Sequence, residues 1–219
     1  MTLPPIEPMV ELLGPLTHIP TGPQIAPPPQ WFNFGERNPD QVDIAELQVT
    51  KSLKDVFDDL RYINQAINRL GYKADITDNW NAYVKSEMEF DKLVSFDCDD
   101  ATLTKRRMLA HGGGMELGAM RPTYCQVPSA QYGASWQDHM VLLVFAKEGT
   151  IVLDNIIPWI YRWDDCPYKW VGFASTKYLW RLCGRKWAKR EVVDARPEVV
   201  EMDIVHPSLK DPVGEELDT

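Results

Sequence analysis

The sequence predicts an α+β fold in which helices come first along the chain and antiparallel strands follow. Apolar side chains recur at intervals of three and four residues between Leu53 and Leu70, which is the period of an amphipathic helix. Four segments rich in β-branched and aromatic residues come later, at 121–127, 138–147, 150–157 and 168–174. Strands and helices do not alternate, which argues against a doubly wound parallel sheet.

The first long helix is predicted to begin with Thr50 or Ser52 as its N-cap and to end at Gly71. Lys54 and Asp58 fall between the apolar positions and mark the side that faces solvent. The apolar stripe consists of Leu53, Val56, Phe57, Leu60, Ile63, Ile67 and Leu70. A stripe of this width predicts that the helix packs on another apolar surface.

A second helix is predicted over 101–110, with Cys98 at its start and the glycines at 112–114 at its end. The unpaired N–H groups and the dipole at a helix N-terminus favour a thiolate over a thiol, so Cys98 is a candidate nucleophile. The alternative is a buried, inert thiol. The acids beside it, Asp97, Asp99 and Asp100, favour a polar setting over an apolar one.

A thiol nucleophile requires a base and a group that orients the base. Among the four histidines, His139 opens a strongly predicted strand, and Asp154 stands inside the next apolar segment, where an acid needs a partner. The alternative is that His139 and Asp154 form a core hydrogen bond without a catalytic role. The remaining histidines are His18, His111 and His206.

The hairpin between these two strands allows two registers. A loop at Glu148 and Gly149 pairs Asp154 with Leu143, four residues or about 13 Å from His139. A loop at 146–147 places His139 directly opposite Asp154. Both registers put the two side chains on the same face of the sheet, so the alternation of side chains does not choose between them.

Three segments resemble the Cys, His and Asp blocks of the bacterial transglutaminase-like cysteine peptidases: FDCDD at 96–100, DHMVL at 138–142 and VLDN at 152–155. The resemblance extends to 28–39, to the helix from Leu53, to 78–80 and to 166–171, so it covers residues 28 to 180. It implies a papain-like, transglutaminase-like fold, in which the cysteine at a helix N-terminus faces an antiparallel sheet that carries the histidine and the aspartate.

The resemblance also implies the chemistry. Cys98 would attack an amide carbonyl, His139 would accept and return the proton, and Asp154 would hold the imidazole, so that a peptide or isopeptide bond of a protein or peptide substrate is hydrolysed. Two alternatives remain open. The same triad can transfer the acyl group to an amine, as transglutaminases do, or the fold can serve as a non-catalytic structural or docking protein of a phage particle.

The acids beside Cys98 raise the question of a metal ion. Negative charge next to a thiolate raises the pKa of the thiol, and a bound cation would cancel that effect. Some members of the family hold calcium next to the nucleophile, so the resemblance makes Asp97 and Asp99 candidate Ca²⁺ ligands. The alternative is that these acids cap the helix. The chemistry itself requires no cofactor.

Composition limits the partners and the location. Asp and Glu outnumber Lys and Arg by 32 to 23, which gives a formal charge of −9 and argues against nucleic-acid binding. The longest apolar stretch, 140–146, is far shorter than the roughly 20 residues that span a bilayer, and no signal peptide is visible. A cytoplasmic or virion-associated protein is expected. Cys125, Cys166 and Cys183 show no metal-binding spacing and are predicted to have no role in the chemistry.

Three parts are predicted along the chain. Residues 1–30 contain nine of the 17 prolines and form an extended arm. Residues 31–190 form the peptidase domain. Residues 191–219, with nine acids against Arg196 and Lys210, form an acidic tail, and both the arm and the tail are candidate docking segments.

Overall fold

The computed structural model describes residues 15–187, except 45, 46, 48, 75, 76, 88–92, 94, 113 and 130–134. The predicted acidic tail at 191–219 and the first 14 residues of the predicted arm lie outside the described residues. Among the described residues, no helix is long and apolar enough to cross a bilayer.

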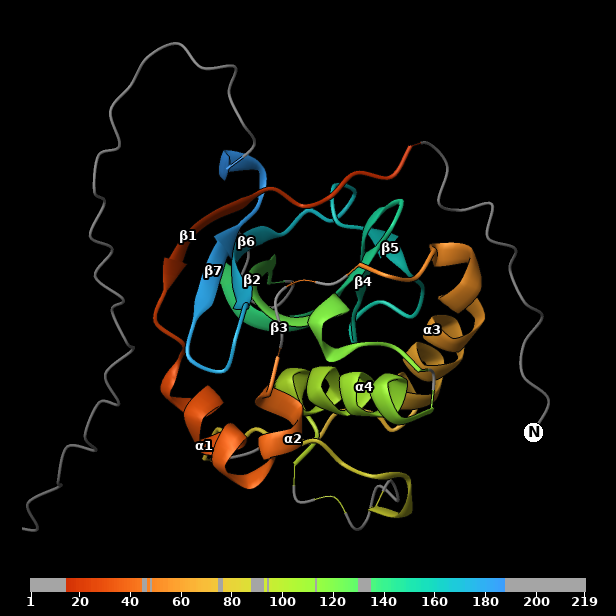
Figure 1. Ribbon diagram of the computed structural model, residues 1–219. Coiled ribbons are helices and arrows are strands. Elements are labelled where there is room, and N and C mark those ends of the chain that lie inside the picture. Colours follow the sequence, from red (N-terminus) through yellow and green to blue (C-terminus); the bar gives the residue numbers. More distant parts are fainter. Residues whose placement is uncertain are drawn as a thin grey trace, which may run out of the picture. The chain divides into compact units, whose positions relative to one another are not determined.

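The core of the fold is a seven-stranded antiparallel sheet in the order β1-β7-β6-β2-β3-β4-β5 (Figure 1). Its strands are β1 (Thr21–Ile25), β2 (Met120–Pro128), β3 (Trp136–Ala146), β4 (Gly149–Leu153), β5 (Tyr161–Arg162), β6 (Lys169–Ala174) and β7 (Trp180–Cys183). The α-helices are α1 (Pro29–Arg37), α2 (Pro39–Val42), α3 (Leu53–Asn68) and α4 (Cys98–Gly112). The mixed helical and antiparallel fold predicted from the sequence is confirmed.

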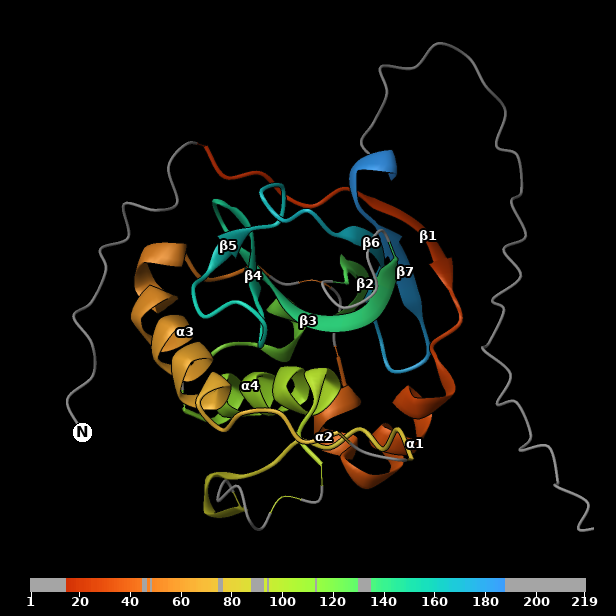
Figure 2. The same ribbon diagram turned by 180° about the vertical axis from the view of Figure 1, so that it is seen from behind.

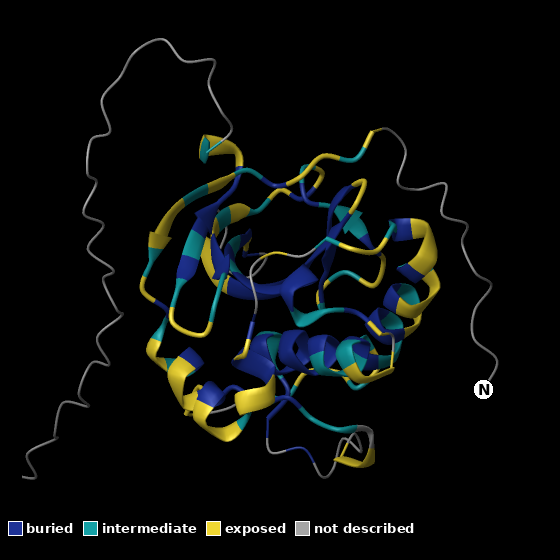
Figure 3. Cartoon of the chain, in the orientation of Figure 1, coloured by how far each residue is buried: buried dark blue, intermediate teal, exposed yellow. Residues whose placement is uncertain are grey.

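Helices α3 and α4 cover one face of the curved sheet (Figures 1 and 2). The apolar stripe predicted for α3 is buried against α4, β3 and β4 in one core cluster, which includes Leu60, Leu109, Leu142 and Leu153. The side of α3 that faces away from the sheet is exposed, whereas α4 and the central strands are largely buried (Figure 3). As predicted, the chain leaves α3 through Gly71, whose φ of 82° is in the left-handed region that favours glycine.

The opposite face of the sheet is covered by the N-terminal segment and by the connection from β5 to β6. Ile19, Trp163 and Cys166 pack there on apolar residues of β2, β3 and β4. The Thr150 backbone N–H donates to Thr17 O (2.9 Å), and the Ile19 N–H donates to Thr150 Oγ1 (3.1 Å). A Cβ at Gly149 would lie 2.8 Å from the Thr17 backbone, so this close crossing requires glycine.

The register of the β3–β4 hairpin lies between the two predicted registers. Ala146 pairs with Gly149 and Leu142 with Leu153, so the loop consists of residues 147 and 148. One further step in this register places Asp154 diagonal to His139, about 7 Å away along the strand. Strand β4 ends at Leu153, earlier than predicted, because the chain turns away after this residue.

The same loop caps α3. The Ser52 side chain makes no capping hydrogen bond, and the Leu53 N–H donates instead to Glu148 Oε2 (2.8 Å). Partial burial acts to raise the pKa of Glu148, but the hydrogen bond from Leu53 contributes to holding it below its usual value. The hairpin loop therefore satisfies one of the unpaired N–H groups at the start of α3.

We expect Glu148→Ala to lower the free energy of unfolding by about 1 kcal/mol at pH 7, because α3 loses the acceptor at its N-terminus. The pKa of Glu148 is lower in the folded state, so this contribution is present above the unfolded-state pKa and is lost as the pH falls through the folded-state pKa. Urea unfolding at several pH values measures it. Glu148→Gln keeps an acceptor and serves as the control; an equal loss in both variants would contradict the capping role.

Candidate active site

Cys98 is the first residue of α4, as predicted. The Ala101 N–H donates to Asp97 O (3.0 Å), which marks the start of the helix. One turn later, the Thr102 hydroxyl donates to Met140 O (3.1 Å) on β3. Cys98 and Met140 belong to the same apolar cluster, so the start of α4 is docked on β3 at the residue next to His139.

His139 and Asp154 form a buried pair. Their relative exposures are 5% and 1%, and His139 Nε2 lies 2.9 Å from Asp154 Oδ1. Asp154 Oδ1 also accepts the Ile156 N–H (2.9 Å), and Asp154 Oδ2 accepts the Tyr168 hydroxyl. Burial acts to raise the pKa of Asp154, but the hydrogen bonds and the charge of His139 outweigh it, so this pKa lies below its usual value.

The structure thus joins His139 and Asp154 directly. It places Cys98, at the start of α4, against the part of β3 that contains Met140, the residue after His139. Asp154 engages Nε2 of His139, which leaves Nδ1 as the ring nitrogen that faces other partners. Within the part of the chain that the structure describes, no hydrogen bond joins Cys98 Sγ to His139. The thiol and the imidazole are therefore not paired in this conformation.

The environment of Cys98 favours the thiol in this conformation. Burial raises its pKa, and the charges of Asp99 and Asp97 raise it further. The backbone N–H groups of Met140 and of Cys98 itself act in the opposite direction but do not compensate. The predicted helix start is confirmed, but burial and the neighbouring carboxylates hold the pKa of Cys98 above its usual value.

Two of the acids beside Cys98 form a compact donor set. One ligand atom each of Asp97, Cys98 and Asp99 lies within 4.8 Å of the others. Burial and a hydrogen bond with Asp97 raise the pKa of Asp99 to about 10, and the charges of Asp97, Asp100 and Asp78 add to this effect. Asp97 Oδ1 is buried, and none of the described residues donates a hydrogen bond to it. This donor set fits a hard cation such as Ca²⁺, which binds carboxylate oxygens.

Asp100, in contrast, has a structural role. Its carboxylate accepts hydrogen bonds from the Asn81 N–H (2.7 Å) and from the Ser95 hydroxyl (2.6 Å). Burial raises its pKa to about 6, although these hydrogen bonds act to lower it. Asp100 therefore ties the segments before α4 to the first turn of the helix.

The sequence interpretation missed three residues of the site. Asp78 accepts from Gln30 Nε2 (2.6 Å) and Trp80 Nε1 (3.3 Å), and its φ of 49° is unusual for a residue other than glycine. Tyr168 binds Asp154, as described above. Asp78 and Tyr168 belong to segments that carried the family resemblance, but nothing in their spacing indicated these contacts. Lys105 is the third.

Lys105 is a buried cation on the Cys98 side of α4. It lies two helical turns after Cys98, and its relative exposure is 1%. Burial lowers its pKa to about 7, although the nearby charge of Asp154 acts to raise it. From the sequence alone, a lysine within a helix is expected on the solvent side. Burying its charged form costs free energy, so Lys105 lowers the stability of the fold.

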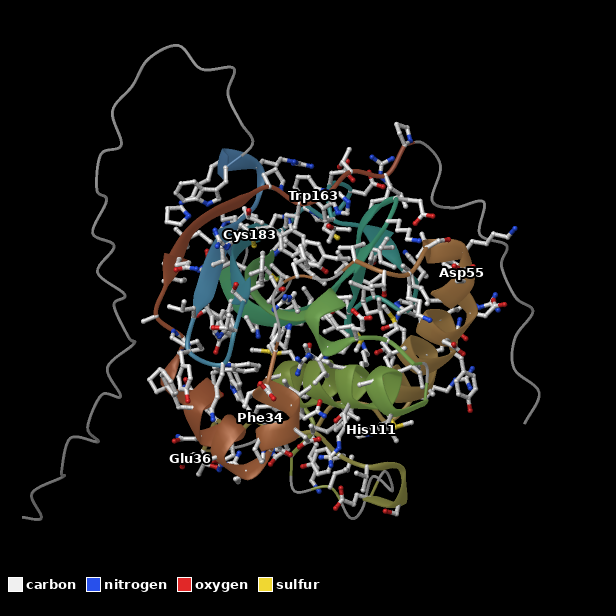
Figure 4. The ribbon with its side chains drawn as sticks, viewed as in Figure 1. Phe34, Glu36, Asp55, His111, Trp163 and Cys183 are labelled. Atoms are coloured by element: carbon white, nitrogen blue, oxygen red, sulfur yellow. The ribbon has the colours of Figure 1, made fainter. Side chains whose placement is uncertain are left out.

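The other three cysteines are buried, and no disulfide joins any of the four cysteines, all of which lie among the described residues. Burial raises the pKa of Cys166 and of Cys183 to about 12 and also raises that of Cys125. Figure 4 shows Cys183 and Trp163 among the core side chains of the sheet, whereas Glu36 and Asp55 lie on the outside. These thiols are part of the core packing.

The model of the bacterial transglutaminase-like cysteine proteinase family matches residues 21–185. The protein belongs to this family. Membership confirms the predicted class of cysteine peptidase, and nothing in the comparisons supports the alternative of a phage structural protein. A search of curated proteins gave no match.

Solved structures of LapG from Legionella pneumophila are similar to this chain. The calcium-bound form is 28% identical, with a TM-score of 0.44, over 57% of this chain and 68% of LapG. A second LapG structure is 29% identical, with a TM-score of 0.41, over 54% and 63% of the two chains. The EGTA-treated form gives 28%, 0.41, 54% and 62%. The matched region therefore spans about two thirds of the LapG chains.

We expect Lys105→Met to raise the free energy of unfolding by about 1 kcal/mol or more below pH 7, because it removes a buried charge and keeps a side chain of similar length. The pKa of Lys105 is lower in the folded state, so the destabilisation by the wild-type lysine is complete below about pH 7 and is relieved as the pH rises towards 10.5. The difference between variant and wild type should shrink over that range. Lys54→Met, at an exposed position of α3, is the control; a loss of stability in Lys105→Met would contradict the prediction.

Proposed function

We propose that the protein hydrolyses a peptide or isopeptide bond of a protein substrate, with Cys98 as nucleophile, His139 as general base and acid, and Asp154 as the orienting carboxylate. The observation that carries the proposal is the buried pair of His139 on β3 and Asp154 directly after β4, next to the point where the start of α4 docks. A histidine held by a carboxylate beside a cysteine at a helix N-terminus is the arrangement that thiol acyl transfer requires.

The reaction follows from these positions. Nδ1 of His139 takes the proton of the Cys98 thiol, and the sulfur attacks the carbonyl carbon of the substrate. The unpaired N–H groups in the first turn of α4 are suited to stabilise the oxyanion. His139 then returns the proton to the leaving amine. Water, deprotonated by the same imidazole, attacks the thioester, releases the acid and restores the thiol.

The carboxylate of Asp154 stabilises the imidazolium formed in both steps. Asp154 accepts hydrogen bonds from His139, Ile156 and Tyr168. These hydrogen bonds stabilise its negative charge although the carboxylate is buried. Its lowered pKa indicates that it is ionised at neutral pH. It does not need to take the proton itself.

We also propose that Asp97 and Asp99 hold Ca²⁺ next to the nucleophile. The support is the hydrogen bond between Asp97 and Asp99 and the buried Asp97 Oδ1, which has no partner among the described residues. A bound cation would cancel the charges of Asp97 and Asp99, which raise the pKa of Cys98. Residues 1–30 and 191–219 stay proposed docking segments for the protein partner.

The proposed nucleophile predicts selective alkylation. At about pH 6 with Ca²⁺ present, we expect iodoacetamide to label Cys98 at least about tenfold faster than Cys125, Cys166 or Cys183, because a thiolate reacts and a buried thiol does not. Peptide mass spectrometry measures each site. His139→Ala should abolish the difference. Equal labelling of all four cysteines in the wild type would contradict the proposal.

Substrate turnover provides the second arm of this experiment. Comparing the protein termini of cell extracts treated with wild type and with Cys98→Ala identifies cleaved bonds that depend on the thiol. Incorporation of a labelled amine into a glutamine peptide, lost in Cys98→Ala, would show acyl transfer instead of hydrolysis. If neither new termini nor amine incorporation is detected, both activities are excluded for the substrates present.

The proposed calcium site makes a separate prediction. EGTA should slow labelling of Cys98 in the wild type, because Asp97 and Asp99 then face the thiolate without a cation. Asp99→Asn removes one of these charges and a ligand, so its labelling rate should no longer depend on calcium. Asp55→Asn, an exposed acid of α3, is the matched control and should respond to EGTA as the wild type does. A wild type that is indifferent to EGTA would contradict the calcium site.

A further inference from the structure

Tyr168 contacts both members of the buried pair. Its hydroxyl donates to Asp154 Oδ2, and its ring meets the His139 ring edge to face, with centroids 6.3 Å apart and planes at 80°. Tyr168 comes directly before β6, and β2 separates β6 from β3 in the sheet. Residues from three separate parts of the chain therefore meet at this point.

We propose that Tyr168 is a positioning residue of the active site, which holds the Asp154 carboxylate and the His139 ring in the orientation that proton transfer requires. The proposal rests on the proposed function of His139 and Asp154. Tyr168 acts through these two residues and is not itself assigned a contact with substrate.

The two oxygens of Asp154 have different partners. Oδ1 accepts from His139 and from the Ile156 N–H, whereas Tyr168 is the hydrogen-bond partner of Oδ2 within the described residues. Asp154 is 1% exposed, so bulk water does not replace a lost donor. Removing the Tyr168 hydroxyl would leave a buried charged oxygen without a donor, and the carboxylate would turn away from His139 or take up a proton.

The phenol is suited to this role because it remains a donor. Burial raises the pKa of Tyr168, and the charge of Asp154 and the hydrogen bond to it raise this pKa further. The Trp170 ring also packs against the Tyr168 ring, with centroids 5.7 Å apart. In the sheet, Cys125 of β2 pairs with His139 on one side and with Trp170 on the other. Strand β2 therefore fixes the distance between the His139 segment and the segment that carries Tyr168.

Tyr161 offers a matched control. Its hydroxyl is buried and has no hydrogen-bond partner within the described part of the chain. Burial raises the pKa of Tyr161, and the nearby charge of Asp154 raises it further. Tyr161→Phe and Tyr168→Phe each remove one hydroxyl from the surroundings of the same carboxylate. They differ in whether that hydroxyl binds Asp154.

The test compares wild type, Tyr168→Phe and Tyr161→Phe with calcium present. The readouts are the rate of Cys98 alkylation per folded molecule, the fraction folded from thermal unfolding, and the NMR signal of the His139 Nε2–H proton. We expect Tyr168→Phe to slow alkylation roughly tenfold and to shift or broaden the proton signal, since the acceptor of that proton has lost its second anchor. Tyr161→Phe should leave both readouts unchanged.

Two results would overturn the proposal. The first is a Tyr168→Phe variant whose alkylation rate and His139 signal match those of the wild type. The second is a variant that is less stable but unchanged in both readouts, which would make Tyr168 a packing residue. If the wild type shows no selective reaction at Cys98, the proposed function fails, whereas the His139 signal still decides whether Tyr168 positions the pair.

Discussion

The register of the β3–β4 hairpin determines the contacts at both of its ends: the cap of α3 at the loop, and the pair of His139 and Asp154 at the open end. Its two-residue loop places Glu148 on the first turn of α3 and lets Gly149 pass against Thr17. At the open end, the same register sets Asp154 diagonal to His139, at a distance that their side chains bridge. A shift by two residues in either direction would separate the pair or crowd it and would also remove the cap of α3.

Two groups of acids near Cys98 show opposite solutions to the cost of burying charge. Asp154 and Asp100 are surrounded by donors, and these donors offset their burial. Asp97 and Asp99 are hydrogen-bonded to each other, and among the described residues Asp97 Oδ1 has no partner. The first arrangement is complete within the protein, whereas the second would be completed by the proposed cation, which would link the metal to the charge state of the thiol.

Helix α3, the start of α4, the four main strands and the pairing of His139 with Asp154 could be predicted from the sequence because each produces a local pattern or a family motif. The register could not, because registers that differ by two residues bury the same side chains. Tyr168 reaches Asp154 from the segment directly before β6, which is distant in the sequence, and Lys105 resembles a solvent-facing helix residue. Such positions are fixed by tertiary packing, which no short window of sequence contains.

The pairing of β1 with β7 has a consequence for how the protein forms. Thr21 lies beside Cys183, so the first described strand is hydrogen-bonded to the last one. During synthesis, β1 has no partner until almost the entire described chain has been made, and closing so long a loop is slow. The β3–β4 hairpin, which carries His139 and Asp154, pairs residues that are close in the sequence, so it can form early. Completion of this edge of the sheet therefore requires almost the entire described chain, whereas the hairpin that carries the buried pair requires only a short part of it.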